Sequence, residues 1–136
     1  MLQSRELFDS LASRADHLDI QILARAADAL SECEQAVTAC VTGMLAEKDG
    51  DELRVAINRD LDCADVVAAT RRVLTRGTDA DHALLTLQLE ACALACERSF
   101  EMCSQYARHH EHCRISSQAT ERATTACREV LQALRP

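Results

Sequence analysis

The chain has few of the residues that interrupt helices. Among its 136 residues there are three glycines and a single proline, Pro136, which is the last residue. Glycine and proline disfavour helix interiors most strongly, so nothing in the composition excludes long helices. Aromatic side chains are also scarce, since Phe8, Phe100 and Tyr106 are the whole set. The core must therefore be built from alanine, leucine, valine, isoleucine and cysteine, which suits closely approaching helices.

Basic clusters and long apolar runs are missing as well. The net charge of -7 argues against nucleic-acid binding, which requires a clustered basic surface. No apolar run approaches the roughly 18–20 residues that cross a bilayer, so we expect no membrane contact. The N-terminal segment 1–16 mixes charges throughout and lacks the apolar stretch of a secretion signal. We therefore expect a cytoplasmic protein, and in that compartment thiols stay reduced.

Polar breaks at 48–51, 76–79 and 108–111 divide the chain into helical segments. We expect Gly77 to end one helix and Thr78 or Asp79 to cap the next. A short amphipathic helix is predicted near 4–12. The four long segments are roughly 15–47, 51–76, 79–107 and 110–134. Apolar residues recur along them at helical spacing, as on the buried side of an amphipathic helix, for example Leu84, Leu87, Ala91 and Leu94.

Short connections between four helices favour antiparallel neighbours. We predict an all-α fold in which an antiparallel up-down four-helix bundle spans about 15–134. The short N-terminal helix precedes it. At 136 residues the chain is most naturally one domain, 1–136, large enough for a core without disulfide bonds.

Eight cysteines are the most unusual feature of the composition, and they recur at helical spacing. Separations of four, seven and fourteen residues return side chains to nearly the same side of a helix. Pairs with such separations are Cys33 and Cys40, Cys92 and Cys96, Cys96 and Cys103, and Cys113 and Cys127, while Cys63 stands alone on its segment. Several helices are therefore expected to direct thiols the same way, an arrangement that points to soft-metal binding.

The up-down topology predicts two levels of thiols. The loops near 49 and 109 should lie at one end of the bundle, and the loop near 78 at the other. The cysteines expected within about three turns of the 49/109 end are Cys40, Cys103 and Cys113. Those expected deeper, at similar heights on all four helices, are Cys33, Cys63, Cys92, Cys96 and Cys127. If these deeper thiols point inward, they form one sulfur-rich layer.

Further candidate ligands lie near the shallower thiols. They are Met44, Met102, His109, His110 and His112. Thiolate, thioether and imidazole together suit Cu(I). Zinc is an alternative, but its structural sites usually contain C-x2-C pairs in loops, and the helical pair Cys92 and Cys96 favours the linear or trigonal coordination of Cu(I). An iron–sulfur cluster, which needs about four thiolates, is a further alternative to Cu(I).

The cysteines and the acidic residues also have simpler, structural interpretations. A buried free cysteine often packs as a small apolar residue, and any one of these thiols is explained equally well that way. Eight thiols at facing heights on four helices favour ligands instead. The acidic pairs at i, i+2 are expected on the solvated surface; they are Glu32 with Glu34 and Asp60 with Asp62.

Three segments resemble a known family. They are NRDLDCADV at 58–66, LEACALAC at 89–96 and HHEHCR at 109–114. They are similar to the cysteine-rich four-helix-bundle copper-binding proteins, the bacterial copper storage proteins, over about residues 30–134. The resemblance implies a bundle lined with thiolates that hold many Cu(I) ions, often assembled as a tetramer. It also implies that histidines and methionines at the open end pass copper in and out.

The chain departs from that family by having fewer cysteines. Family members carry further cysteines where this chain has Val37, Met44, Ala56, Val67, Ser99, Ser116, Thr120 and Ala123. The replacements are small and mostly apolar, so core volume is roughly kept while sulfur is lost. About half of the ligands implied by the resemblance are missing. We therefore expect a few defined sites rather than a bulk store.

The predicted function is a cytosolic Cu(I)-binding protein that holds a few ions and buffers, stores or handles copper. No catalytic motif is present, so we expect no enzyme. One alternative is a metalloenzyme or electron-transfer protein with a single copper or iron–sulfur site. Another is a metal-free bundle that acts as an interaction module. Expected partners are metal ions and further copies of the chain, in a dimer or tetramer.

Overall fold

The computed structural model describes residues 4–10 and 19–135 and is built from helices. Five α-helices follow in chain order: α1 (Ser4–Ser10), α2 (Ile20–Leu45), α3 (Arg54–Thr75), α4 (His82–Cys103) and α5 (Glu111–Ala133). Short 3-10 turns, η2 (Gly77–Asp79) and η3 (Ser104–Tyr106), lie in two connections. No strand occurs among the described residues. The all-α prediction is confirmed.

The helix boundaries follow from local capping chemistry. Asp19 accepts a hydrogen bond from the Gln21 backbone N–H at 2.7 Å, and this begins α2. Gly77 has the positive φ of 62° that ends a helix at low steric cost, as expected. The cap of α4 is Asp81, which accepts from the Leu84 N–H at 3.1 Å, so the prediction of Thr78 or Asp79 was wrong. The parts of the predicted helices that fall on residues 11–18 lie outside the described residues.

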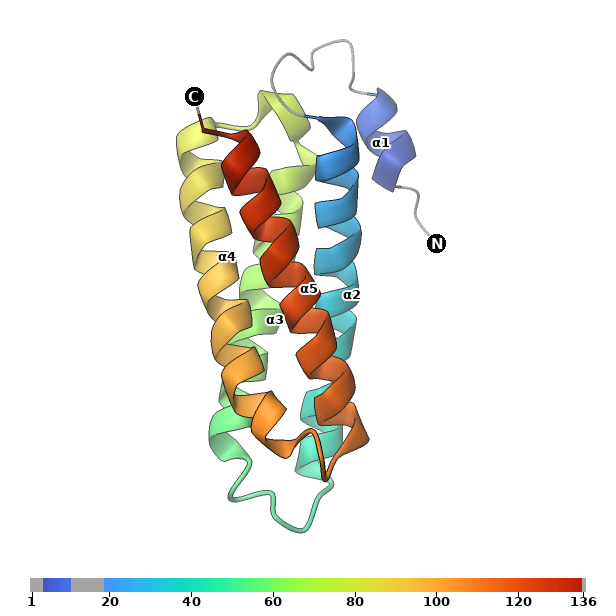
Figure 1. Ribbon diagram of the computed structural model, residues 1–136, viewed down its shortest axis with the longest axis vertical. Coiled ribbons are helices and arrows are strands. Elements are labelled where there is room, and N and C mark those ends of the chain that lie inside the picture. The colour runs from blue at the N-terminus through green and yellow to red at the C-terminus, as the bar shows by residue number, and fades with distance from the viewer. Residues whose placement is uncertain (1–3, 11–18, 136) are drawn as a thin grey trace.

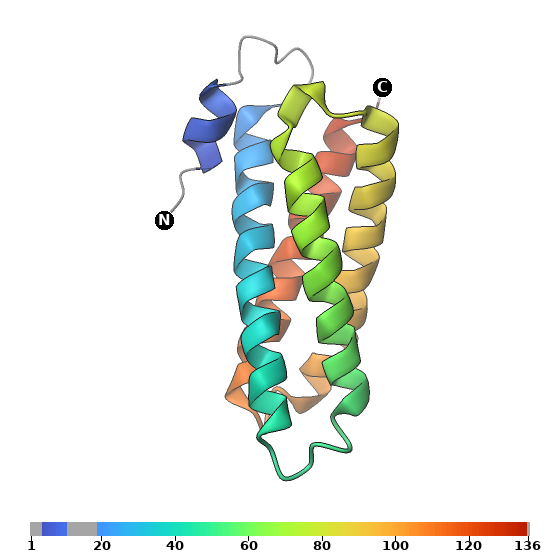
Figure 2. The ribbon, with the colours of Figure 1, turned by 180° about the vertical axis from the view of Figure 1, so that it is seen from behind.

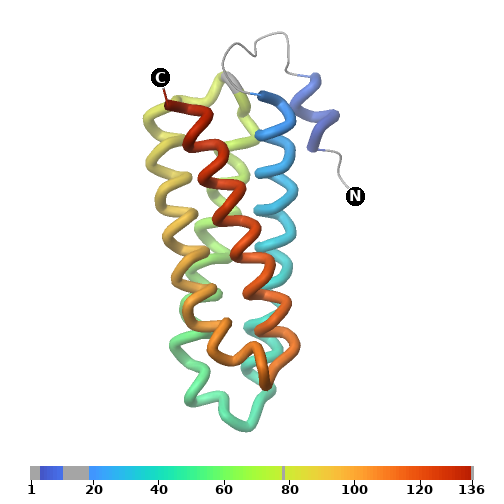
Figure 3. The backbone as a smooth tube through the Cα atoms, in the orientation of Figure 1, coloured from blue at the N-terminus to red at the C-terminus, as the bar shows by residue number. Residues whose placement is uncertain are grey.

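Four long helices run up and down around a common axis (Figure 1). The tube view shows each helix antiparallel to the next along the chain (Figure 3). The loops 46–53 and 104–110 lie at one end, which we call the mouth, and the connection 76–81 lies at the other (Figure 2). This agrees with the predicted arrangement. Helix α1 packs outside α2, where Phe8 is buried and Ser4 Oγ donates to Asp28 Oδ1 at 2.7 Å.

The buried side of each helix recurs every three or four residues. On α3 it comprises Ala56, Asp60, Cys63, Val67, Thr70 and Leu74. On α4 it comprises Leu85, Leu89, Cys92, Ala93, Cys96, Ser99 and Cys103. The stripe predicted to be buried on α4, which contains Leu84, Leu87, Ala91 and Leu94, is instead exposed. Helix α4 carries apolar residues on two sides, and spacing alone does not identify the one that packs inward. None of the described helices is both long and apolar enough to cross a membrane.

Candidate metal centre

All eight thiols are fully buried, and they divide between two core clusters. The larger cluster contains the thiols that we call the deep layer: Cys33, Cys63, Cys92, Cys96 and Cys127. The smaller cluster, nearer the mouth, contains the shallow layer: Cys40, Cys103 and Cys113, packed with Met44. The prediction that five thiols lie deeper and three lie nearer the mouth is confirmed. It arises because every cysteine occupies the inward stripe of its helix.

The deep layer brings together three thiols from three helices. Cys63 Sγ lies 3.8 Å from both Cys33 Sγ and Cys96 Sγ, and all three sulfurs lie within 4.8 Å of one another. With two edges of 3.8 Å and a third of at most 4.8 Å, a cation equidistant from the three sulfurs lies about 2.2–2.5 Å from each, which brackets a metal–thiolate bond of about 2.3 Å. The sulfur positions therefore match a trigonal soft-metal site.

The helical pair Cys92 and Cys96 is not the unit from which this site is built. Cys96 joins Cys33 and Cys63 across helices, whereas Cys92 belongs to no group of three ligands among the described residues. The neighbour that most affects Cys92 is Cys127 on α5, whose thiol lowers the pKa of Cys92 to about 4. The deep layer thus contains one group of three sulfurs and one adjacent pair.

The shallow layer combines sulfur with an imidazole. Cys40 Sγ lies 3.9 Å from Cys113 Sγ, and His112 Nδ1 lies 3.6 Å from Cys40 Sγ and 3.5 Å from Cys113 Sγ. A second group joins Cys40 and Cys103 to Asp60. These residues come from all four long helices. The layer therefore offers two overlapping groups of three donors.

Asp60 is fully buried, so its placement on the solvated surface was wrong. Its Oδ1 accepts from Ser99 Oγ at 2.5 Å and from Cys103 Sγ at 3.2 Å, while Oδ2 has no partner. Burial raises the pKa of this carboxyl to about 8, because the charged form is poorly solvated there. A spacing signal was available, since Asp60 continues the inward stripe between Ala56 and Cys63. Asp62, by contrast, is exposed.

Hydrogen bonds among the thiols divide their protons unevenly. The hydrogen bond from Cys63, with another from Cys96, lowers the pKa of Cys33 to about 5. Hydrogen bonds with Cys33 and Cys63, together with burial, raise the pKa of Cys96. In the shallow layer, hydrogen bonds from Cys103 and Cys40 lower the pKa of Cys113 to about 4. Some thiols ionise readily, whereas their neighbours hold their protons until a cation replaces them.

Two of the three predicted histidines converge at the mouth. His110 and His112 stack with ring centroids 5.3 Å apart, and both approach Glu47 at the end of α2. His109 is exposed and belongs to no ligand group among the described residues. Gly43 makes room for His112, because a Cβ at that position would lie 2.7 Å from the imidazole ring. Glu47 was missed by the sequence analysis, although its place before the first break puts it at the same end as the histidines.

The eight positions at which the resemblance implied further cysteines all lie in the core. Each is fully buried: Val37, Met44, Ala56, Val67, Ser99, Ser116, Thr120 and Ala123. The buried hydroxyl of Ser116 has no hydrogen-bond partner. The inward stripes are therefore mixed, with apolar and hydroxyl side chains between the thiols.

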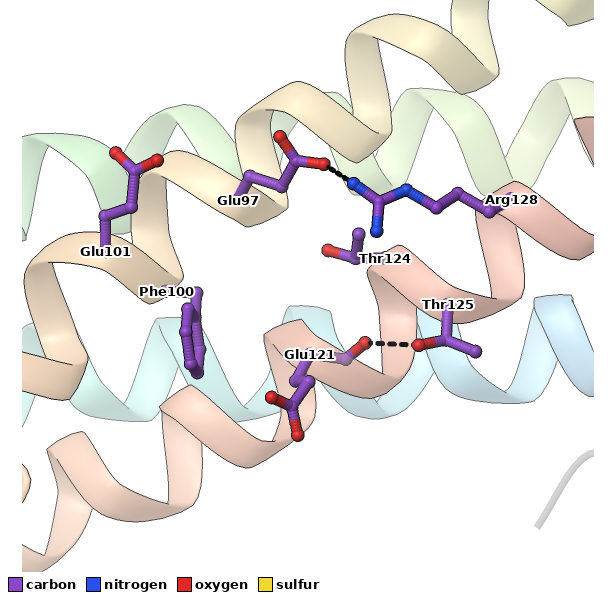
Figure 4. Close-up of a pocket in the computed structure, with 7 residues that line it drawn as sticks. All are labelled: Glu97, Phe100, Glu101, Glu121, Thr124, Thr125 and Arg128. Carbon is purple, nitrogen blue, oxygen red and sulfur yellow. Dashed lines mark hydrogen bonds and ion pairs between the residues drawn. The ribbon is translucent and has the colours of Figure 1, made fainter.

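Surface pockets are separate from these thiols. One lies between α4 and α5 and is lined by Glu97, Phe100, Glu101, Glu121, Thr124, Thr125 and Arg128 (Figure 4). Arg128 forms an ion pair with Glu97 across it. No thiol or imidazole lines this pocket. The donor groups suited to soft metals thus lie inside the bundle and at its mouth.

A helical bundle with a buried group of three thiols, and two further groups that combine two thiols with a histidine or an aspartate, defines a class of protein, the soft-metal-binding bundles. The sequence model of the copper storage protein family, Csp, matches residues 19–132, and the chain belongs to that family. No match was found among curated proteins.

Solved structures of a Streptomyces lividans protein are similar to this chain. Its copper storage protein Ccsp loaded with 10 copper equivalents is 35% identical, with a TM-score of 0.90 over 96% of this chain and 98% of that one. A structure of copper loading to a cytosolic copper storage protein from the same organism, with five coppers, is 38% identical. Its TM-score is 0.80, over 82% of this chain and 93% of that chain. The fold is thus shared with proteins that store copper.

Proposed function

We propose that this chain stores copper in the cytosol as Cu(I), bound by the thiolates of its two layers. The observation that carries the proposal is the Cys33–Cys63–Cys96 group on three different helices, in which Cys63 Sγ lies 3.8 Å from each of the other two sulfurs. Copper loading of the similar Streptomyces lividans protein, and its description as cytosolic, support the cargo and the location. The role is to hold ions, and no catalytic step is part of it.

The donor number favours Cu(I) over the alternatives. Structural zinc sites take four protein ligands, and iron–sulfur clusters take about four thiolates. The ligand groups among the described residues contain three donors each, and the deep group contains sulfur alone. Soft thiolates in sets of two or three suit Cu(I).

Copper would enter by the mouth. His112 lies between solvent and the shallow layer, with Nδ1 3.5 Å from Cys113 Sγ. The low pKa of Cys113 provides a thiolate next to that imidazole, with Cys40 Sγ 3.9 Å away. A route from His112 to Cys113 and Cys40, and then to the deep layer, follows the order of depth. Met44, fully buried beside the shallow thiols, offers a thioether on that route. His109 is exposed, so its part in this route is at most a first contact with a copper ion at the surface.

The number of stored ions should be small. Eight thiols are present, while the eight positions at which the resemblance implied further cysteines hold fully buried side chains without a thiol. Asp60 and Ser99 form a hydrogen-bonded pair that interrupts the series of thiols between the two layers. On α4, Ser99 stands between Cys96 and Cys103, and on α3, Asp60 stands on the mouth side of Cys63. We expect fewer tight copper equivalents than the 10 loaded into the Streptomyces lividans protein.

Self-association is the second part of the proposal. The exposed stripe on α4 includes Leu84, Leu87 and Leu94, and Leu87 is 65% exposed. A groove beside it, between α3 and α4, is lined by apolar residues that include Val66 and Leu94. Charged residues of both signs line the same groove: Arg59, Arg98, Asp62 and Asp65. An apolar stripe beside groups of mixed charge suits a second copy of the same surface, as in a dimer or tetramer.

The direct test is an anaerobic titration of the reduced protein with Cu(I) against a competing chelator. We expect several tight equivalents, with proton release as thiols become thiolates. The variant C33A/C63A/C96A should lose those of the deep layer. Val37→Ala is the matched control, since it removes core volume from α2 without removing a thiol. Chelator that retains all the copper against wild-type protein would refute the proposal.

A further inference from the structure

The mouth contains a group of donors that differs chemically from the thiol layers. Glu47, His110 and His112 each offer one ligand atom, and these atoms lie within 4.8 Å of one another. Glu47 Oε1 lies 3.4 Å from His110 Nδ1 and 3.1 Å from His112 Nε2. No sulfur belongs to this group. Its carboxylate and imidazole donors are harder than thiolates and suit divalent zinc, cobalt or copper better than Cu(I).

The spacing fits a divalent ion. A tetrahedral cation with bonds of about 2.0–2.1 Å to nitrogen and oxygen holds its donors about 3.3–3.4 Å apart. The two carboxylate–imidazole distances, 3.4 and 3.1 Å, are close to that edge. The side chains are partly exposed, His110 by 12%, His112 by 24% and Glu47 by 35%, which leaves room for water on the solvent side. Both carboxylate–imidazole distances therefore suit a single ion, and the two imidazole nitrogens lie within 4.8 Å of each other.

The second nitrogen of each imidazole also has a partner. His110 Nε2 lies 3.4 Å from Asp49 Oδ2, which is the carboxylate–histidine arrangement that orients metal-binding imidazoles. His112 directs Nδ1 toward the thiols of Cys40 and Cys113. Gly43 leaves the space that the His112 ring occupies. Both rings are thus held with one nitrogen toward Glu47.

We infer that Glu47, His110 and His112 form a separate site for a divalent transition-metal cation at the mouth of the bundle. The site shares His112 with the copper route proposed above, but it takes a different class of ion and does not depend on copper storage. A divalent ion bound there fixes His112, whose other nitrogen faces the shallow thiols. Binding of a divalent ion at this site would therefore affect the position of His112 at the entrance to the thiol layers.

Co(II) is the probe, because its spectrum distinguishes sulfur from nitrogen and oxygen ligands. The Cu(I) titration is run first and reports on copper storage by itself. Anaerobic Co(II) titrations of the copper-free and Cu(I)-loaded proteins follow, read by absorbance and calorimetry. We expect one equivalent with weak visible bands and no sulfur charge-transfer band. Its affinity should fall at least tenfold in Glu47→Gln and in His110→Ala.

Two further variants sharpen the result. Gly43→Ala pushes the His112 ring away and should also weaken Co(II) binding, whereas Glu52→Gln changes an exposed acid of the same loop and should not. Every variant should retain the deep-layer Cu(I) equivalents. Co(II) bound only with sulfur charge transfer, or with equal affinity in wild type and Glu47→Gln, would overturn the inference. So would the absence of Co(II) binding in both forms of the protein.

Discussion

Asp60 shows how one buried acid changes the pH response of the protein. Its folded-state pKa of about 8 lies above the ordinary value of 3.8, so the folded protein holds a proton that the unfolded chain releases. Between about pH 4 and 8 the folded state binds more protons at this position, and its contribution to stability falls as pH rises, by about 1.4 kcal/mol per unit. Cys33 and Cys113 act oppositely, because the pKa of each is lowered.

We predict that Asp60→Asn removes this contribution. Relative to wild type, the metal-free variant should gain stability with rising pH, by on the order of 2 kcal/mol between pH 5 and 7. The measurement is urea unfolding of the reduced protein at each pH, expressed as the difference between variant and wild type. Asp62→Asn, on the exposed side of α3, is the control and should show no such trend. A difference independent of pH would contradict the assignment.

Helical spacing predicted some of the buried side chains of this core and not others. The positions of Cys63 and Cys96 were predictable because a helix repeats its direction every three to four residues. The burial of Asp60 was missed because its acidity was given more weight than its place on that repeat. The contact between Glu47 and His112 depends on the side-chain space left by Gly43, and no helical period encodes it.

Helix pairing decides which thiols act together. The deep group takes one sulfur from each of α2, α3 and α4, so an ion bound there ties three helices to one another. Spacing along α4 suggested Cys92 and Cys96 as a unit, but the group of three donors that contains Cys96 takes its other two sulfurs from neighbouring helices. Likewise, the leucine stripe of α4 was wrongly predicted to face the core. Helical spacing shows which residues share one side of a helix, but it does not show whether that side faces the core or the solvent. Such relations between helices are set by packing angles.

We predict that the first Cu(I) ions stabilise the bundle through this cross-helix group. A ligand that binds only the folded state at a thousand times its Kd contributes about 4 kcal/mol. Cys96→Ala should lose most of the increase in unfolding temperature caused by the first equivalents. Cys92→Ala, an identical truncation one turn away on the same helix, should retain it. The measurement is anaerobic thermal unfolding with and without Cu(I), and equal losses in the two variants would refute the cross-helix assignment.

The whole molecule presents its apolar residues in two directions. The thiol-lined stripes pack inward, while Leu84, Leu87 and Leu94 of α4 remain on the outer surface. These leucines belong to the stripe that was wrongly predicted to be buried within the bundle, and under the proposed self-association a second chain would cover them. Assembly through these leucines would leave the mouth uncovered, because Leu84 and Leu87 lie in the first half of α4 and Leu94 lies near its middle, whereas the mouth loop 104–110 follows the other end of that helix.

We predict that L87E/L94E dissociates the assembly and leaves copper binding intact. Two carboxylates placed in the stripe would be buried unpaired against the partner, at a cost of several kcal/mol. Sedimentation velocity should show wild type as a dimer or tetramer of the 15.0 kDa chain and the variant as a monomer. Ile115→Glu is the control, since it adds a charge at an exposed apolar residue of α5, away from this stripe. A monomeric wild-type protein would disprove the assembly. A mass of L87E/L94E equal to that of the wild type would show that the interface lies on another surface. If the monomer still binds the wild-type number of Cu(I) equivalents, storage belongs to the single bundle, as the enclosed thiol layers indicate.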